Sequence, residues 1–137
     1  MCIRVAAAMT STGGSTSASA RVSEMIPVHR WDEIALEKIT EMISRKIVRG
    51  EREMLAQTYL KRGAQVPMHS HDSEQMTYVL QGALRFLVDG EEIIVKEGEV
   101  LHIPSGTPHQ AEALEDTFEL DVFSPIRTDW LEAEPVR

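Results

Sequence analysis

Three histidines in this sequence are spaced so that their imidazole groups could meet around one metal ion. His69 and His71 are two residues apart, and alternate residues of a strand point to the same face. His109 follows a turn rich in proline and glycine, from which an antiparallel strand could return beside the first two. Each feature alone is ordinary, because a His-x-His pair is often two exposed residues and a single histidine often lies in a turn or a core.

The residues after His71 include one that could join the two histidines on the same face of the strand. Gln75 has the same strand parity as His69 and His71, whereas Glu74 has the opposite parity. A regular strand therefore points Gln75 inward with the histidines and Glu74 outward. A bulge between residues 71 and 75 would reverse this assignment.

The composition limits the chemistry that these residues can perform. The chain has 137 residues with five histidines, a single cysteine and a formal net charge of -8. One cysteine cannot form an intramolecular disulfide and excludes zinc sites built from several cysteines, so a metal must be held by nitrogen and oxygen atoms. The acidic balance argues against binding to nucleic acid. The sequence also lacks an apolar run of about 18 residues that would span a membrane.

The elements that must position the histidines are short strands. Apolar and polar residues alternate in segments separated by turns that contain glycine, and Asp89-Gly90 between two such segments strongly indicates a hairpin. This pattern predicts an all-β sandwich or barrel. The expected strands cover residues 43–47, 54–60, 75–80, 83–88, 91–96, 100–103 and 118–123. Residues 32–39 are expected to form a short helical turn with Asp32 as its cap.

The first 24 residues differ from the rest of the chain. Residues 10–20 are almost entirely Ser, Thr, Gly and Ala, which bury too little apolar area to offset the entropy of ordering, so residues 1–24 are expected to be a disordered extension. A signal peptide is the alternative, because Arg4 precedes a small apolar stretch and residues 18–20 resemble a cleavage site, although that stretch is short. A third possibility is a natural start at Met25. The folded domain is then expected to be residues 25–137.

Two ordered motifs contain the histidines and resemble those of the cupin family. The first reads Gly63-x5-His69-x-His71-x3-Gln75-x6-Gly82, and the second reads Gly98-x5-Pro104-x-Gly106-x2-His109. The resemblance implies a single double-stranded β-helix, or jelly-roll barrel, with a short N-terminal arm and one divalent transition metal in its mouth. By position, the implied metal ligands are His69, His71, Gln75 and His109. Gln75 stands where the family usually has Glu, and Ala113 stands where it usually has Asn.

The glutamine has a chemical consequence if it binds the metal. Three neutral imidazoles and a neutral amide leave the charge of a divalent ion uncompensated, which makes the ion a stronger Lewis acid and attracts anionic substrates. A ligand set without thiolate is compatible with nickel, iron, manganese, zinc or copper. Of the two other histidines, His102 is expected to line the cavity or fill the core, and His29 has no assigned role.

The segment near the C-terminus narrows the resemblance. It reads Asp121-x-Phe123-Ser-Pro-x-Arg127, and together with the stretch from His69 to Gly82 it is similar to the pectin-degradation cupins of the KdgF type. That group implies an isomerase reaction, the ring opening and ketonisation of 4,5-unsaturated uronic acid monosaccharides from pectin or alginate. It also implies that Asp121 transfers protons, Arg127 holds the substrate carboxylate and Phe123 packs against the sugar. Without the resemblance, these are an aspartate at a strand end, a core phenylalanine and a solvated arginine.

Other functions are compatible with the same residues. A metal-dependent cupin oxygenase would use the same kind of ligands, a sugar-binding cupin would bind uronates without turnover, and the metal could be structural or absent. The resemblance also implies a homodimer that exchanges the segment Ile26–Val48, whereas in a monomer the apolar residues of this segment would cover one face of the barrel. These residues are Ile34, Leu36, Ile39, Met42, Ile43 and Ile47. A cytoplasmic location and a small anionic sugar as the substrate are expected.

Overall fold

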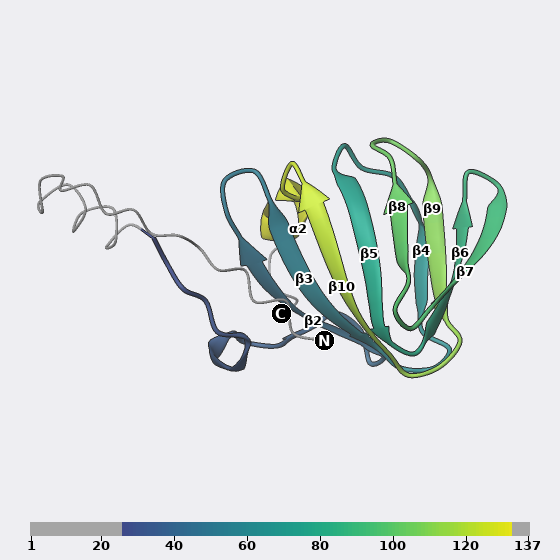
Figure 1. Ribbon diagram of the computed structural model, residues 1–137, viewed down its shortest axis with the longest axis horizontal. Helices are drawn as coiled ribbons and strands as arrows, with labels where there is room; N and C mark the ends of the chain where they lie inside the picture. Colours follow the sequence, from purple (N-terminus) through teal and green to yellow (C-terminus); the bar gives the residue numbers. More distant parts are fainter. Residues whose placement is uncertain (1–25, 133–137) are drawn as a thin grey trace, which may run out of the picture.

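Two antiparallel sheets face each other and form a jelly-roll barrel (Figure 1). The structure is a computed structural model that describes residues 26–132. Nearly all regular structure in this part of the chain is strand, which confirms the predicted all-β class. The predicted disordered segment 1–24 lies outside the described residues.

The larger sheet has six strands and the smaller sheet has four. The order in the larger sheet is β1 (Glu37–Lys38), β2 (Ile43–Arg49), β3 (Met54–Leu60), β10 (Thr117–Ser124), β5 (Glu74–Gln81) and β8 (Val100–Ile103). The order in the smaller sheet is β4 (Gln65–His69), β9 (His109–Ala113), β6 (Ala83–Val88) and β7 (Glu91–Lys96). Strands distant in sequence, such as β3 and β10, are therefore neighbours, and this brings the C-terminal segment beside the early part of the barrel.

The segment before the barrel is an arm rather than a helix. The prediction of a helical turn over residues 32–39 is wrong in its extent: a 3-10 turn, η1, covers only Trp31–Glu33, and Glu37–Lys38 is a strand paired with β2. Asp32 lies inside η1 and accepts hydrogen bonds from the Arg30 guanidinium instead of capping a helix. Residues 37–38 adopt an extended conformation because Glu37 pairs with Arg45 across the sheet. This tertiary pairing overrides a weak local preference for helix. The arm runs away from the barrel (Figure 1).

Tight turns connect the strands where the sequence predicted them. Asp89 and Gly90 both have positive φ angles, 47° and 84°, as a two-residue hairpin turn requires. Gly82 has a φ of 97°, and a Cβ atom there would lie 2.6 Å from the carbonyl oxygen of Asp116. No other residue type fits at position 82 without moving the backbone of the loop before β10.

Inward-facing side chains divide into two apolar clusters. The main cluster lies between the sheets and includes Ile43, Leu60, Val79, Leu84, Phe86 and Ile103. A smaller cluster consists of Met54, Ala56 and Phe123, and the helix α2 (Thr128–Glu132) packs its Trp130 against it. The C-terminal helix thus covers one end of the barrel, beside β3 and β10.

The arm and the start of the barrel leave apolar side chains uncovered in the single chain. Ile43 is buried and Ile47 is partly buried, but Leu36, Ile39 and Met42 are exposed, with Leu36 at 55%. Within residues 26–132, no helix has the length and hydropathy needed to cross a membrane.

Candidate metal centre

A β-bulge places His69 and His109 opposite each other at one end of the smaller sheet. Val66 pairs with Ala111, and the register of β4 and β9 then shifts, so that His69 rather than Met68 pairs with His109. The extra residue falls at Pro67-Met68, and proline is tolerated at such an interruption because it has no N–H to donate. Without the shift, the inward position beside His109 would belong to Met68, which is exposed in the structure.

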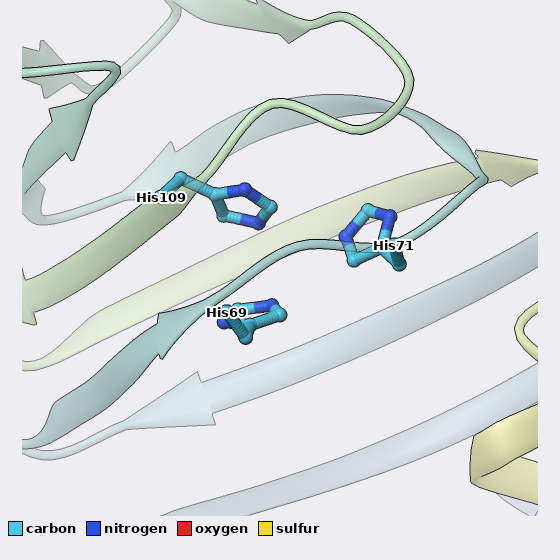
Figure 2. A group of neighbouring side chains, drawn as sticks. All are labelled: His69, His71 and His109. Carbon is cyan, nitrogen blue, oxygen red and sulfur yellow. The ribbon is translucent and has the colours of Figure 1, made fainter.

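His71 lies beyond the end of β4, in the loop that leads to β5, and its ring still turns toward the other two (Figure 2). The ring centroids of His69 and His109 are 4.3 Å apart, and that of His71 lies 5.0 Å from His109 and 5.5 Å from His69. One ring nitrogen from each histidine lies within 4.8 Å of the others. The three predicted histidines therefore form one group that could hold a metal ion.

Each imidazole is held in the same way, by the backbone carbonyl group of a residue two positions away in the sequence. The Nδ1 atoms of His69, His71 and His109 lie 2.8 Å from the carbonyl oxygens of Pro67, Ser73 and Thr107, respectively. A carbonyl oxygen only accepts, so Nδ1 carries the proton and Nε2 keeps a free lone pair. The Nε2 atom of His109 is fully buried and has no hydrogen-bond partner in the described part of the chain. This is the arrangement by which proteins orient histidine ligands of a metal.

The electrostatic surroundings favour the neutral imidazoles of His71 and His109. Burial lowers the pKa of His109 to about 4, although its hydrogen bond to Thr107 acts in the opposite direction. Burial also lowers the pKa of His71, and the positive charge of Arg127 lowers it further. Neutral imidazoles are the form that binds a metal.

Gln75 adds an oxygen atom to the three nitrogens. It is buried on β5, and its Oε1 lies 3.0 Å from Nε2 of His71. Its Nε2 donates to Oγ1 of Thr77 at 2.9 Å and to Oδ1 of Asp121 at 3.4 Å. The Thr77 hydroxyl donates its own proton to Asp121 and can therefore only accept from Gln75, which fixes the orientation of the amide. With Nδ1 of His71 protonated, two acceptor atoms face each other at 3.0 Å, and a cation would satisfy both. The donor set therefore fits a divalent metal.

Glu74 and His102 lie on the outer face, away from this group. Glu74 is exposed, as the alternation of side chains predicts, and Gln75 is inside. The expectation that His102 lines the cavity or fills the core is wrong: it is exposed, and its Nε2 lies 2.8 Å from the Glu74 carboxylate. Met76 is its partner across the β5–β8 ladder, and Met76 also faces outward.

Asp121 and Phe123 occupy inward positions of β10, next to Gln75. Oδ1 of Asp121 accepts a hydrogen bond of 2.6 Å from the Thr77 hydroxyl. Burial raises the pKa of Asp121, and the hydrogen bond from Thr77 and the charge of Arg127 oppose that rise. Phe123 is buried, and its ring meets the edge of the His71 ring at 5.6 Å.

Arg127 is buried rather than solvated, and it stacks on aromatic rings. Its guanidinium carbon lies 4.6 Å from the centre of the Trp130 ring and 5.3 Å from that of Phe123. Its Nε and Nη2 atoms donate to the Asp129 carboxylate at 3.0 and 2.7 Å, and this contact lowers the pKa of Asp129. One edge of the guanidinium is thus occupied, and the Nη1 side remains for another partner.

These residues surround a cavity of about 380 Å³ inside the barrel. His69, Gln75, His109, Asp121, Phe123 and Arg127 all line it. The opposite part of its wall is apolar and includes Val66, Leu84, Phe86 and Ala111. A concave, largely apolar space with a few converging polar groups is typical of a small-molecule site.

Several residues of the cavity wall were not predicted from the sequence. Glu119 and Thr58 line it, as do Trp130 and Arg45, whose guanidinium carbon lies 3.9 Å from the Trp130 ring centre. The strand parity of β10 could have identified Glu119, which lies two residues before Asp121 on the same buried face. Strand parity also places Thr58 on the buried face of β3, but its position beside Glu119 depends on the pairing of β3 with β10.

Comparison with known proteins identifies a family match over the barrel. A family model described as a cupin domain matches residues 57–124. The pectin degradation protein KdgF of Dickeya dadantii is 31% identical over 103 residues, which cover 73% of this chain and 94% of that protein. An uncharacterized protein of Methanocaldococcus jannaschii is 33% identical over 75 residues, which cover 54% of this chain and 60% of that protein.

A solved structure of similar fold is that of KdgF from a Halomonas species. It has 34% sequence identity and a TM-score of 0.68, and the match covers 72% of this chain and 93% of that one.

Proposed function

This chain belongs to the cupin family, and from that premise we propose that it is a metal-dependent isomerase that opens the ring of 4,5-unsaturated uronic acid monosaccharides. One observation carries the proposal: a single cavity brings an acid–base carboxyl group, Asp121, and a buried cation, Arg127, next to three imidazoles suited to a metal. The resemblance to pectin-degradation proteins supplies the substrate class.

The proposed reaction moves one proton and changes no oxidation state overall. The hydroxyl group at C1 loses its proton, the bond between C1 and the ring oxygen breaks, and C1 becomes an aldehyde. The oxygen left on C5 is then an enolate, which becomes a ketone when C4 takes up a proton. A divalent transition metal on the imidazoles and Gln75 (nickel, iron, manganese, zinc or copper) would supply a Lewis acid for the negative charge that develops on oxygen.

Asp121 is the proposed proton carrier. It would accept the proton from the C1 hydroxyl and deliver a proton to C4. Burial raises the pKa of its carboxyl group toward the working pH, where an acid–base group is most effective. The hydrogen bond of 2.6 Å from Thr77 holds Oδ1 of Asp121 in place beside the cavity.

Arg127 and Phe123 would position the sugar. The free side of the Arg127 guanidinium can pair with the substrate carboxylate, because Asp129 occupies only the Nε–Nη2 edge. Phe123 provides an apolar surface that contacts both the Arg127 guanidinium and His71. This local positive site is needed because the chain as a whole carries a net charge of -8, which repels an anionic ligand.

An NMR time course with a 4,5-unsaturated galacturonate tests the proposal. The metal-loaded protein is expected to convert the ring form to the open keto form faster than the spontaneous reaction, and chelation followed by removal of the metal should abolish this difference. No acceleration by the metal-loaded protein would refute the isomerase function. Binding without conversion would indicate a sugar-binding cupin, and oxygen uptake with a phenolic substrate would indicate an oxygenase.

We also propose that the protein acts as a cytoplasmic homodimer. Leu36, Ile39 and Met42 are exposed on the single chain, and so are Met76 and Tyr78 on the outer face of the larger sheet. A second copy that covers these residues would remove apolar area from water. Sedimentation equilibrium is expected to give twice the chain mass, with a weaker dimer for Leu36→Asp. A monomer at every concentration would overturn the proposal, and cell fractionation tests the location.

A further inference from the structure

Two polar side chains lie deep in the cavity, beyond the proposed acid–base group. Glu119 precedes Asp121 by two residues on the same inward face of β10, and Thr58 on β3 is its direct partner across the ladder. Two residues of strand correspond to about 7 Å. Both residues line the cavity that contains the histidines.

Each of these two side chains has one buried oxygen atom without a hydrogen-bond partner among the described residues. Thr58 is 8% exposed and Glu119 is 6% exposed. Oγ1 of Thr58 and Oε2 of Glu119 are fully buried and have no hydrogen-bond partner among residues 26–132. Buried polar atoms are normally hydrogen-bonded, and an isolated pair that faces a cavity needs an explanation.

The surrounding wall is largely apolar, although Thr40, Arg45 and Gln65 also line the cavity and the Asp121 carboxyl group lies within hydrogen-bonding reach of Glu119. Ile43, Leu60 and Leu84 line the cavity, and all three belong to the apolar core cluster. Burial raises the pKa of Glu119 well above its usual range, and the nearby charge of Asp121 raises it further. Both causes favour the uncharged form of the Glu119 carboxyl group, which can occupy this part of the cavity without a counterion.

We infer that Thr58 and Glu119 form an inner subsite that binds a hydroxyl group of the substrate. A hydroxyl group both donates and accepts, and it can therefore satisfy the threonine oxygen and the carboxyl oxygen together. An apolar group would leave both atoms unpaired. The subsite deepens the proposed function, on which it rests, because it selects a ligand with a carboxylate at one end and a hydroxyl at the other.

The geometry suits a single sugar ring. A ligand whose carboxylate meets Arg127 and whose C1 end meets Asp121 would extend one of its other hydroxyl groups along β10 toward Glu119. The separation of about 7 Å along the strand is comparable to one hexose ring with its substituents. The 2- or the 3-hydroxyl group is the one expected to reach the pair.

Calorimetric binding of saturated galacturonate tests the subsite apart from turnover, because this sugar has the carboxylate and the 1-, 2- and 3-hydroxyl groups of the proposed substrate but no C4=C5 double bond, so it cannot undergo ketonisation. Its additional 4-hydroxyl group is present in every measurement of the series. Thr58→Val keeps the size of the side chain and removes its hydroxyl, and we expect binding about 5- to 10-fold weaker, the worth of one net hydrogen bond. Thr58→Ser is expected to recover most of the lost affinity. Thermal unfolding and metal content of each variant check that the barrel is intact.

Analogues without one hydroxyl group complete the experiment. The 2-deoxy or the 3-deoxy sugar is expected to bind wild type as weakly as the full sugar binds Thr58→Val, with no additional loss when both changes are combined. Glu119→Gln alters the second partner, and it should weaken the binding of these deoxy sugars less than the binding of the full sugar. Equal affinity of wild type, Thr58→Val and Glu119→Gln for every sugar would overturn the subsite, as would the absence of any binding to wild type. Binding that depends on Thr58, but without conversion of the unsaturated sugar, would support the subsite and refute the isomerase function.

Discussion

The two sheets of the barrel contribute different chemistry to one cavity. The four-stranded sheet contributes His69 and His109 from β4 and β9, and the rest of its contribution to the cavity wall is apolar except for Gln65. The six-stranded sheet contributes oxygen-bearing side chains, with Gln75 from β5 and Asp121 and Glu119 from β10. Nitrogen atoms that could hold a metal and oxygen atoms that could handle protons and hydroxyl groups thus belong to separate walls.

This separation teaches that metal retention and chemistry should respond to different substitutions. Two residues connect the walls. His71 lies in the loop between β4 and β5, and Gln75 contacts both His71 and Asp121. Changes confined to one wall should therefore affect one property, and the following predictions test that independence.

The largest effect is expected from substitution of a histidine on the four-stranded sheet. His109→Ala removes a buried imidazole whose Nε2 faces the other histidines, so metal content should fall from about one ion per chain to near zero, and activity should be lost with it. Elemental analysis after dialysis measures this. His102→Ala is the matched control, because that histidine is paired with Glu74 on the outer face and should change neither quantity. Full metal content in His109→Ala would contradict the assignment.

Substitutions on the six-stranded sheet should reduce activity while the protein keeps its metal. Asp121→Asn retains the shape of the side chain and removes its ability to carry a proton, and we expect kcat to fall about 10²- to 10⁴-fold. Metal content should equal that of wild type. Unchanged kcat would remove Asp121 from the reaction, and a parallel loss of metal would show that the two walls are not independent.

A smaller effect is expected at the edge of the cavity. Arg127→Lys keeps the charge and loses the planar, two-pronged donor, so KM for the unsaturated uronate should rise roughly 10-fold with a lesser change in kcat. Initial rates over a range of substrate concentrations distinguish the two. An equal KM for both proteins would mean that the substrate carboxylate is held elsewhere.

The smallest effect concerns stability without the metal. The pKa of His109 is lowered from 6.5 to about 4, so the unfolded chain binds more protons in this interval, and the free energy of unfolding should fall as the pH falls from about 6.5 to about 4. Urea unfolding of metal-free wild type and His109→Gln measures the difference in slope. That comparison isolates His109, because the raised pKa of Glu119 acts with the opposite sign in both proteins. Parallel curves would mean that His109 titrates normally.

Strand alternation predicted much of the barrel and part of the site. The expected strands are present, and Gln75 and Glu74 point inward and outward as expected. The continuous strand from His69 to Gln75 on which that expectation rested is interrupted, because β4 ends at His69 and β5 begins at Glu74. The meeting of His69 with His109 depends on the bulge at Pro67-Met68, which shifts the register of two strands distant in sequence. Local alternation cannot reveal a shift that is defined only by the partner strand.

Other features depended equally on tertiary structure. His102 was expected inside because it alternates with Val100, but the inward position of β8 belongs to Ile103. Arg127 is buried because α2 brings Trp130 against Phe123, and a helix of five residues has too short a pattern to be recognised in sequence. Glu119 was within reach of the parity argument, whereas the position of Thr58 beside it required knowledge of the β3–β10 ladder.

The position of Trp130 gives the protein an intrinsic optical probe of its own cavity. Its indole lies close to two guanidinium groups, with the ring centre 3.9 Å from the guanidinium carbon of Arg45 and 4.6 Å from that of Arg127, and against the Phe123 ring at 4.9 Å. The chain has only one other tryptophan, Trp31, which lies in the arm outside the barrel. In a Trp31→Phe protein, an anion that draws Arg127 away from the indole would change its emission, so ligand arrival could be followed by fluorescence without any added label.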